Sequence, residues 1–477
     1  MTNLLKNNFI YLSVTSIGNK LFFFIVAMLV GRYLGIVELG KYSFALSFVM
    51  MFSVFVDMGI FTVSVRDLSQ EPKNAPMYLG NLIVLKSIIS IGIIVIGSCL
   101  TYILPWSQDT FLICFLFFFF IVIDSLSFVL RMVFRSHESF WYEMVSDLGG
   151  KLLSISLVVM VIFNHGNLYY VVSSLIIGGI GTFVLGFYFI QRRFFIIYLR
   201  FDYSFCRSIL VRSSPLVVSW LFISIYNNID KILIKYFWGN EELGQYSISL
   251  LLSNILQMLP IVFSGLLLPR MCWYYEKDRN ILENFMSVML KASLALSFLS
   301  AGFFYCYSVY FCSIFFRLQG TPLLNASVCL RILAWAQIPI FLYTIMNNLF
   351  ICANAQRTLA LLSSWTCIIS LLLFPVMIRF LGIFGAAFAY LILHVALLII
   401  TFLSIDRHLL TVRNAFELKK FVPASFCAIL TFIAIKSYTI HGAYILSLFT
   451  YFCLLYIMRF ISDSDFVLVQ KFIHSEG

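Results

Sequence analysis

Apolar stretches of helix-spanning length follow one another along almost the whole chain, and this feature restricts the possible folds more than any other. The first stretch runs from Phe9 to Tyr33, and about fourteen such stretches can be counted before the chain ends. A helix needs about 20 apolar residues to cross a bilayer, whereas a barrel strand alternates over about 10. The pattern therefore predicts an all-α polytopic membrane protein with about 14 spans.

The composition excludes a single water-soluble core. Hydrophobic residues make up 62% of the chain and charged residues 11%, and the mean hydropathy is +0.99. Soluble domains are typically about 45–50% apolar and about 25% charged. The turn between two of the stretches, 359–380 and 383–405, is so short that twelve spans remain an alternative count. The predicted spans lie near 9–33, 42–63, 79–104, 110–133, 145–163, 168–190, 209–236, 246–269, 285–309, 327–351, 359–380, 383–405, 421–437 and 442–460.

The distribution of loop charges predicts the orientation. With the N-terminus in the cytoplasm, most loop lysines and arginines fall on the cytoplasmic side, in agreement with the positive-inside rule. We therefore expect a multi-pass protein of the bacterial inner membrane with both termini cytoplasmic. The net charge of +11 follows from this topology and does not indicate nucleic-acid binding. The opposite side holds only Arg32, Lys41, Arg317, Arg379 and Lys436.

An internal repeat relates two parts of the chain. The segment 35–43, GIVELGKYS, aligns with 239–247, GNEELGQYS, at an offset of 204 residues. Six of the nine positions are identical, and at the same offset Arg66 aligns with Arg270. Each repeat contains about six spans, so both halves enter the membrane with the same orientation. Halves of this kind enclose a substrate site between them.

The repeat and the loop composition together predict four regions. Residues 1–190 form an N-terminal six-helix bundle and residues 209–405 a C-terminal six-helix bundle around a central cavity. The segment between them, 191–208, mixes arginines with aromatic residues and is predicted to be a cytoplasmic amphipathic linker. Residues 406–477 comprise a cytoplasmic loop, two extra helices and a tail.

Three segments carry a resemblance to a known family. They are GRYLGIVELGKYSFALSF at 31–48, NNIDKILIKYFWGNEELGQYS at 227–247 and GIFGAAFA at 382–389. Together they resemble the polysaccharide-transport branch of the multidrug/oligosaccharidyl-lipid/polysaccharide superfamily, and most closely its O-antigen unit flippases (Wzx type) from Gram-negative bacteria. The resemblance implies transfer of an undecaprenyl-diphosphate-linked oligosaccharide from the cytoplasmic to the periplasmic leaflet. It also implies the lipid bilayer and polysaccharide polymerase machinery as partners.

Cations within the spans point to an anionic substrate. A charge at the bilayer centre costs about 2.5–3.5 kcal/mol, so several intramembrane cations are expected to face a water-filled cavity or one another. Lysine and arginine both bind phosphate, so a cationic cavity suits a diphosphate headgroup. The residues predicted to line a substrate-binding cavity are Lys20, Lys86, Lys151, Lys231, Lys291 and Arg331.

Structural roles are alternatives for several of these charges. Lys86, Lys151 and Lys291 also fit side chains that snorkel to the membrane surface, and Lys231 with Asp230 fits pairing to a neighbouring helix. Arg131 and Arg212 are interpreted as interfacial anchors.

Coupling to a gradient of H⁺ or Na⁺ requires a titratable or ion-binding group inside the membrane. The ion-coupling candidates are Asp57, Asp124, Asp230 and His394, and the sequence does not distinguish the two ions. No cofactor, metal or catalytic set is expected, and the chain is predicted not to be an enzyme. The 11 cysteines lie mostly within apolar runs and are expected to be small hydrophobic residues without disulfide partners.

Two other functions remain open. A drug/cation antiporter of the same superfamily would share the two-bundle fold, but it should favour an acidic cavity. A membrane polysaccharide polymerase would carry a large outward loop, and here the longest outward loop is about 311–326.

Overall fold

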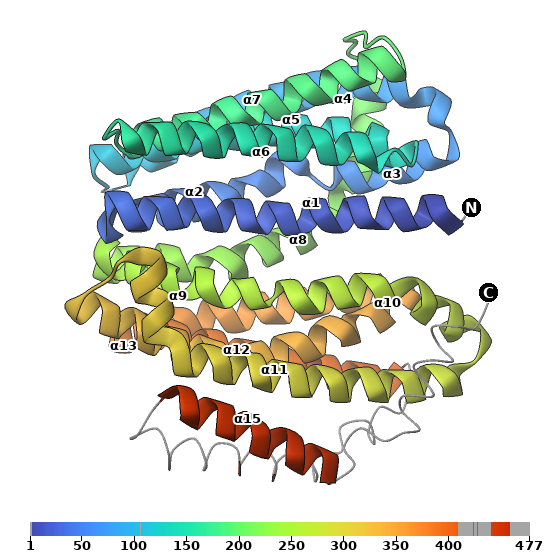
Figure 1. Ribbon diagram of the computed structural model, residues 1–477. Coiled ribbons are helices and arrows are strands. Elements are labelled where there is room, and N and C mark those ends of the chain that lie inside the picture. Colours follow the sequence, from blue (N-terminus) through green and yellow to red (C-terminus); the bar gives the residue numbers. More distant parts are fainter. Residues whose placement is uncertain (1, 105, 409–422, 424–426, 428–439, 458–477) are drawn as a thin grey trace. The chain divides into compact units, whose positions relative to one another are not determined.

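The computed structural model describes residues 2–104, 106–408, 423, 427 and 440–457, and these residues form helices without any strand (Figure 1). The helices are α1 (Thr2–Leu29), α2 (Ile36–Asp57), α3 (Ile60–Gln70), α4 (Ala75–Ile103), α5 (Gln108–Ser136), α6 (Phe140–Phe163), α7 (Leu168–Arg193), α8 (Tyr203–Trp238), α9 (Asn240–Leu256), α10 (Met258–Lys277), α11 (Arg279–Phe316), α12 (Gly320–Cys352), α13 (Gln356–His408) and α15 (Ile440–Ile457). The π-helix η1 (Val30–Leu34) follows α1, and the 3₁₀ helix η2 (Pro72–Asn74) precedes α4.

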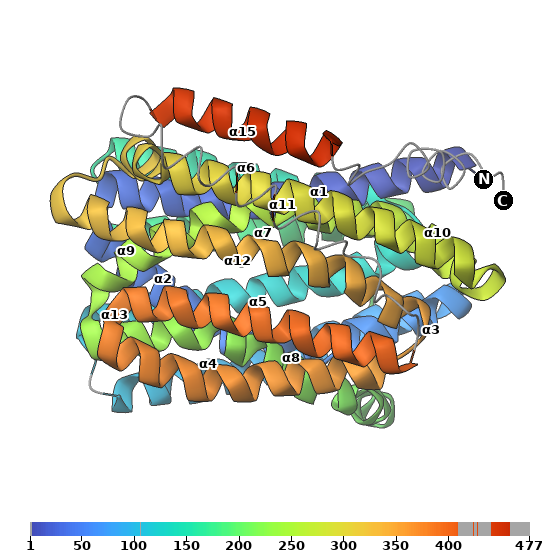
Figure 2. The same ribbon diagram turned by 90° about the horizontal axis from the view of Figure 1, so that it is seen from below.

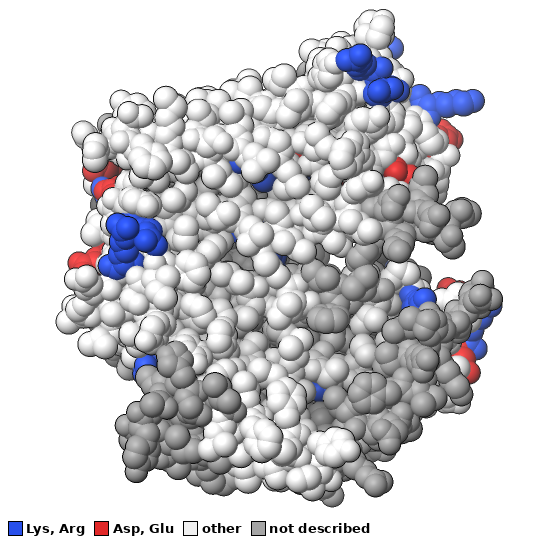
Figure 3. All heavy atoms as spheres, in the orientation of Figure 1, with Lys and Arg blue, Asp and Glu red and all other residues white. Residues whose placement is uncertain are grey.

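Ten helical segments in the described part of the chain are long and apolar enough to cross a membrane. On the face drawn in Figure 3, uncharged side chains cover nearly all of the described surface between the two ends of the helices. Such a surface suits lipid, because lipid tails offer no partner to charged groups. The protein is therefore an all-α polytopic membrane protein, and the predicted fold class is confirmed.

The helix limits differ from several of the predicted spans, and the span 42–63 is broken after Asp57, where α2 ends before α3 begins at Ile60. The span 246–269 is broken at Gln257, where α9 ends and α10 begins. The spans 359–380 and 383–405 form one helix, α13, which turns at Gly382 (φ 61°, ψ −138°) into two arms visible in Figure 2. Most of the span 421–437 lies outside the described residues.

Contacts between helices divide the chain into two compact units, Met1–Ile248 and Ser249–Gly477. In the first unit, α6 packs closely against α7 through glycines. A Cβ at Gly178 would lie 2.6 Å from the carbonyl oxygen of Gly150, and a Cβ at Gly150 would lie 2.5 Å from that of Gly178. These glycines therefore serve close helix packing, as small residues commonly do in membranes.

The two copies of the repeated segment also meet inside the first unit. Gly35 and Gly239 have the same backbone conformation, with φ of 98°, and each directly precedes a helix. A Cβ at Gly40 would lie 2.7 Å from the carbonyl carbon of Asn240, and a Cβ at Gly244 would lie 3.0 Å from that of Ile36. The two copies thus make reciprocal backbone contacts that side chains would block.

The second unit has a continuous apolar core drawn from α10, α11, α12, α13 and α15. Within it the Sγ atoms of Cys272 and Cys352 form a disulfide, with their Cα atoms 4.5 Å apart. The expectation that no cysteine has a disulfide partner is therefore wrong. The two residues are 80 positions apart, and only the packing of α10 against α12 brings them together.

Candidate functional site

A cluster of ion pairs lies inside the first unit, and its first part joins three helices. Lys86 of α4 donates to Asp57 Oδ1 at 2.6 Å and to Ser125 Oγ at 2.8 Å, and Ser125 donates to Asp57 at 2.7 Å. The Lys86 side chain is 1% exposed, whereas that of Asp57 is 39% exposed. Asp57 ends α2 because Met58 and Gly59 both have positive φ, which breaks the helix. The alternative that Lys86 snorkels to the membrane surface is thereby excluded.

The second part of the cluster centres on Asp147 of α6. Arg131 Nη2 lies 2.6 Å from Asp147 Oδ1 and 3.8 Å from Asp124 Oδ1, and Lys151 Nζ lies 2.8 Å from Asp147 Oδ2. Lys151 also donates to Asn19 of α1. Asp147 is 1% exposed, so it serves as the buried shared anion of two cations. Arg131 is 11% exposed at its side chain, and its interpretation as an interfacial anchor is wrong.

The ring of Phe128 on α5 connects the two parts. It lies 5.8 Å from Lys86 Nζ and 5.5 Å from Arg131 Cζ. We define the ionic cluster as Asp57, Lys86, Ser125, Asp124, Arg131, Asp147, Lys151 and Asn19. Its three cations are matched by three carboxylates, so its formal charge is zero.

A cavity of about 130 Å³ opens beside the ionic cluster between α1, α5, α6 and α7. It has room for a few water molecules and is too small for a sugar. Asp124 lines it, and this side chain is 52% exposed. Small ions and water can therefore reach a carboxylate here, whereas a lipid-linked saccharide cannot enter.

Two further cations differ from those of the ionic cluster. Within the part of the chain that the structure describes, no carboxylate lies within 4 Å of Lys20 on α1 or of Arg331 on α12. Lys20 is half-buried. Arg331 donates its Nε to Ser308 Oγ at 2.9 Å and lies 5.7 Å from the ring of Tyr305. Both cations are thus available to an external anion.

The remaining predicted residues lie in other places. Lys231 pairs with the adjacent Asp230 at 3.0 Å, and Asp230 also accepts a hydrogen bond from Tyr246 at 2.9 Å. Lys291 is 6% exposed in α11. His394 is 6% exposed, hydrogen-bonds the carbonyl oxygen of Tyr390 through Nδ1 at 2.8 Å, and packs against the ring of Tyr390.

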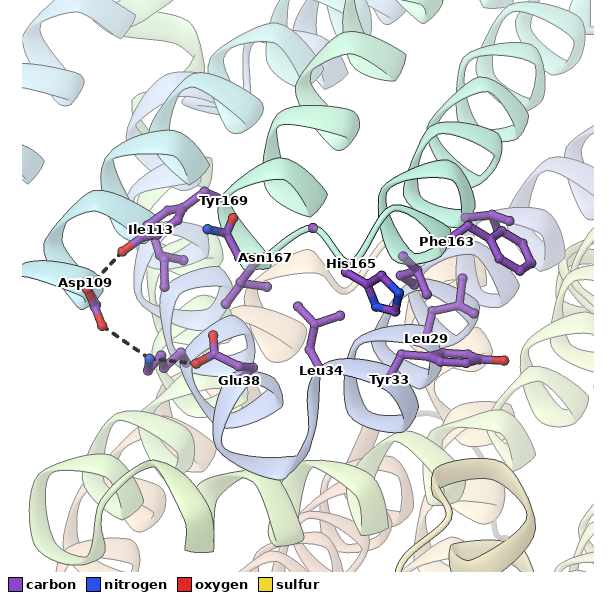
Figure 4. Close-up of a pocket in the computed structure, with 15 residues that line it drawn as sticks. Leu29, Tyr33, Leu34, Glu38, Asp109, Ile113, Phe163, His165, Asn167 and Tyr169 are labelled. Carbon is purple, nitrogen blue, oxygen red and sulfur yellow. Dashed lines mark hydrogen bonds and ion pairs between the residues drawn. The ribbon is translucent and has the colours of Figure 1, made fainter.

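A wider pocket of about 990 Å³ lies where η1, α2, α5, α6 and α7 meet (Figure 4). Lys41 pairs with Glu38 at 2.7 Å and with Asp109 at 3.4 Å on one wall, and Tyr169 donates to Asp109 at 3.0 Å. His165 lies on the opposite side (Figure 4). This pocket is not among the sites predicted from the sequence, although Glu38 and Lys41 belong to the repeated segment.

Sequence and structure comparisons place the chain among known proteins. The family described as polysaccharide biosynthesis protein matches residues 5–274. No curated protein matches the chain significantly. The lipid II flippase MurJ in an inward closed conformation has a similar structure, with a TM-score of 0.73 and 15% identity over 95% of this chain and 99% of that one.

A multidrug resistance MATE family transporter of the MOP superfamily, in an inward-facing conformation, is also similar. Its TM-score is 0.65 at 13% identity, covering 83% of this chain and 97% of that one. The MATE multidrug transporter DinF-BH, solved in a ligand complex, gives a TM-score of 0.60 at 15% identity, over 87% and 97% of the two chains. Because the sequence identities to these solved structures are low, the structural similarity shows a common fold only. The family model, in contrast, matches more than half of the chain and therefore identifies the sequence family. The chain belongs to the polysaccharide biosynthesis protein family.

Proposed function

We propose that this protein is a flippase that moves an undecaprenyl-diphosphate-linked oligosaccharide, such as an O-antigen or similar repeat unit, between the leaflets of the bacterial inner membrane. The observation that carries the proposal is the pair of intramembrane cations, Lys20 and Arg331, without a carboxylate partner in the described chain. An intramembrane charge is costly unless it finds a counter-ion, and a diphosphate supplies one. The family assignment and the fold shared with a lipid II flippase support it.

The proposed mechanism is alternating access through a cationic cavity. Lysine and arginine attract the diphosphate and the sugars that follow it, while the apolar chain stays in the bilayer. The substrate enters from the cytoplasmic leaflet and leaves on the periplasmic side, with both termini of the protein cytoplasmic. No covalent bond is made or broken in this scheme.

The test is deletion of the gene in the native host, followed by assay of the surface polymer and of the leaflet in which lipid-linked units accumulate. We expect loss of the polymer and units trapped on the cytoplasmic side. Normal polymer together with new sensitivity to cationic drugs would instead establish the antiporter.

Complementation of that deletion tests Lys20. The variant Lys20→Ala is expected to restore less than a tenth of wild-type polymer, because the lost charge-assisted contact is worth about 1.5–3 kcal/mol. Lys20→Arg should restore most of it, since the positive charge is kept. The matched control is Lys73→Ala, which removes an exposed lysine from η2 and should complement normally. Full complementation by Lys20→Ala at normal protein level would contradict the cationic site.

Asp124 is proposed to couple transport to an ion gradient, because it is a half-exposed carboxylate that lines a cavity sized for water and ions. Transport into vesicles should be stimulated by an imposed pH or Na⁺ gradient in the wild type, and this stimulation should vanish in Asp124→Asn. Glu71→Gln, at an exposed position, serves as control and should respond normally. A retained gradient response in Asp124→Asn would assign coupling to another group.

The antiporter remains the second candidate, because one observation favours it. Asp57 and Asp124 are both partly exposed carboxylates, and a cationic drug could pair with either. The matching cations in the ionic cluster already neutralise them, which makes that pairing weaker than in an acidic cavity.

A further inference from the structure

Arg331 faces a cleft of the second unit. The proposed function uses the charge of Arg331 but gives no role to this cleft. The cleft has a volume of about 440 Å³ and lies between α11, α12 and the second arm of α13. Its walls come almost wholly from aromatic and aliphatic side chains, and Arg331 is the single charged residue among the described residues that line it. The lining residues are Tyr305, Val328, Arg331, Ile332, Trp335, Phe384, Phe388 and Leu391.

The guanidinium is held in place at one edge only. Its Nε donates to Ser308 Oγ at 2.9 Å, and its Cζ lies 5.7 Å from the Tyr305 ring. Guanidinium carries five N–H donors in a planar fork that matches the oxygens of a phosphate. In the described chain the terminal nitrogens of this side chain have no carboxylate within 4 Å, whereas Lys86, Arg131 and Lys151 all do.

The depth of Arg331 in the membrane distinguishes between two sources of phosphate, the headgroup of a resting phospholipid and the headgroup of a lipid that is crossing the bilayer. The 33 residues of α12 span about 50 Å, and Arg331 lies 11 residues, about 17 Å, from Gly320. In a helix centred on the bilayer this is about 8 Å from the midplane, inside a hydrocarbon core about 30 Å thick. The phosphates of resting phospholipids stay in the headgroup layer. For α12 centred in this way, a phosphate bound to Arg331 would belong to a lipid in the course of crossing and not to a resting phospholipid.

We propose that this cleft binds the diphosphate of the lipid-linked substrate during its passage, with Arg331 holding the phosphate oxygens and the aromatic walls packing the polyprenyl chain. The inference rests on the proposed flippase function and adds a binding site to it. Phe388 is 43% exposed and Val328 37% exposed, so both offer apolar area that the chain can cover. Burial of apolar surface contributes about 25 cal/mol per Å², which favours an occupant with a hydrocarbon chain over a free anion.

The test uses the full-length protein in lipid nanodiscs, with a photoreactive residue in place of Phe388. The probe is undecaprenyl diphosphate, and phosphatidylglycerol and inorganic pyrophosphate are the competitors. We expect the photoreactive residue to crosslink to the probe. The apparent affinity for the probe should be about tenfold to a hundredfold lower in Arg331→Gln, and Arg331→Lys should keep part of the wild-type affinity. A photoreactive residue at Leu372, which is exposed on the other arm of α13 and outside the cleft, is the control and should give little crosslink.

A second variant keeps the test valid if Arg331→Gln does not fold. Val328→Glu places a carboxylate three residues before Arg331 on the same helix, where it can pair with the guanidinium and displace the probe. Crosslinking that is unchanged in both variants would overturn the proposal. Equal competition by phosphatidylglycerol or by pyrophosphate would overturn the assignment to a crossing lipid. Absence of any crosslink between the probe and the photoreactive residue at position 388, together with normal leaflet transfer, would reject the cleft and leave the flippase function standing.

Discussion

Replacing Asp147 by alanine is expected to destabilise the protein by about 3–5 kcal/mol, because Arg131 and Lys151 would remain buried without their shared anion. Arg131 Nη2 lies 2.6 Å and Lys151 Nζ 2.8 Å from the Asp147 carboxylate, which is 1% exposed. Thermal unfolding of the purified protein in detergent measures the effect, together with the yield of folded protein. We expect a large fall in both.

The control for this variant is Ser156→Ala, because Ser156 is exposed on the same helix and its hydroxyl donates to a backbone carbonyl of its own turn. It should unfold close to the wild type. A triple variant, Arg131→Met with Asp147→Leu and Lys151→Met, removes the charges together and is expected to recover most of the lost stability. If Asp147→Ala unfolds like the wild type, the ionic cluster does not stabilise the first unit.

Much of the fold can be predicted from local sequence, since span length and hydropathy depend only on neighbouring residues. The lysines and aspartates at 86, 124, 147 and 151 are recognisable as intramembrane charges for the same reason. The spacing of Asp147 and Lys151, four residues apart on one helix, is a direct signal of their pairing. Local patterns thus identify the charged residues correctly.

Partners that come from distant parts of the chain cannot be predicted in this way. Arg131 lies near the end of its apolar stretch and so resembles an interfacial anchor, yet the packing of α5 on α6 buries it against Asp147. Asn19 contacts Lys151 across 132 positions, and Cys272 meets Cys352 across 80. Such contacts depend on which helix faces meet in space, and hydropathy carries no information about that.

Replacing Gly40 by valine is expected to reduce transport at least about tenfold, because the new side chain would meet the backbone of Asn240. A Cβ at Gly40 would lie 2.7 Å from the carbonyl carbon of Asn240 and 3.1 Å from its Cα, and the backbone at a helix start cannot rotate away as a side chain can. The N-terminal parts of α2 and α9 would have to separate, and small residues at helix contacts in membranes serve to prevent this separation. Leaflet transfer of lipid-linked units, measured in cells that lack the wild-type gene, tests the variant.

The reciprocal contact makes the prediction sharper. Gly244 occupies the equivalent position in the second copy of the repeat, and its Cβ would lie 3.0 Å from the carbonyl carbon of Ile36, so Gly244→Val should give the same defect. Gly92→Val on α4 is the matched control, because no atom lies within 4 Å of a Cβ built there. Normal transfer by Gly40→Val and Gly244→Val would show that the close approach of the two copies is dispensable. A defect in both, with Gly92→Val normal, would tie transport to a contact that only the repeat provides.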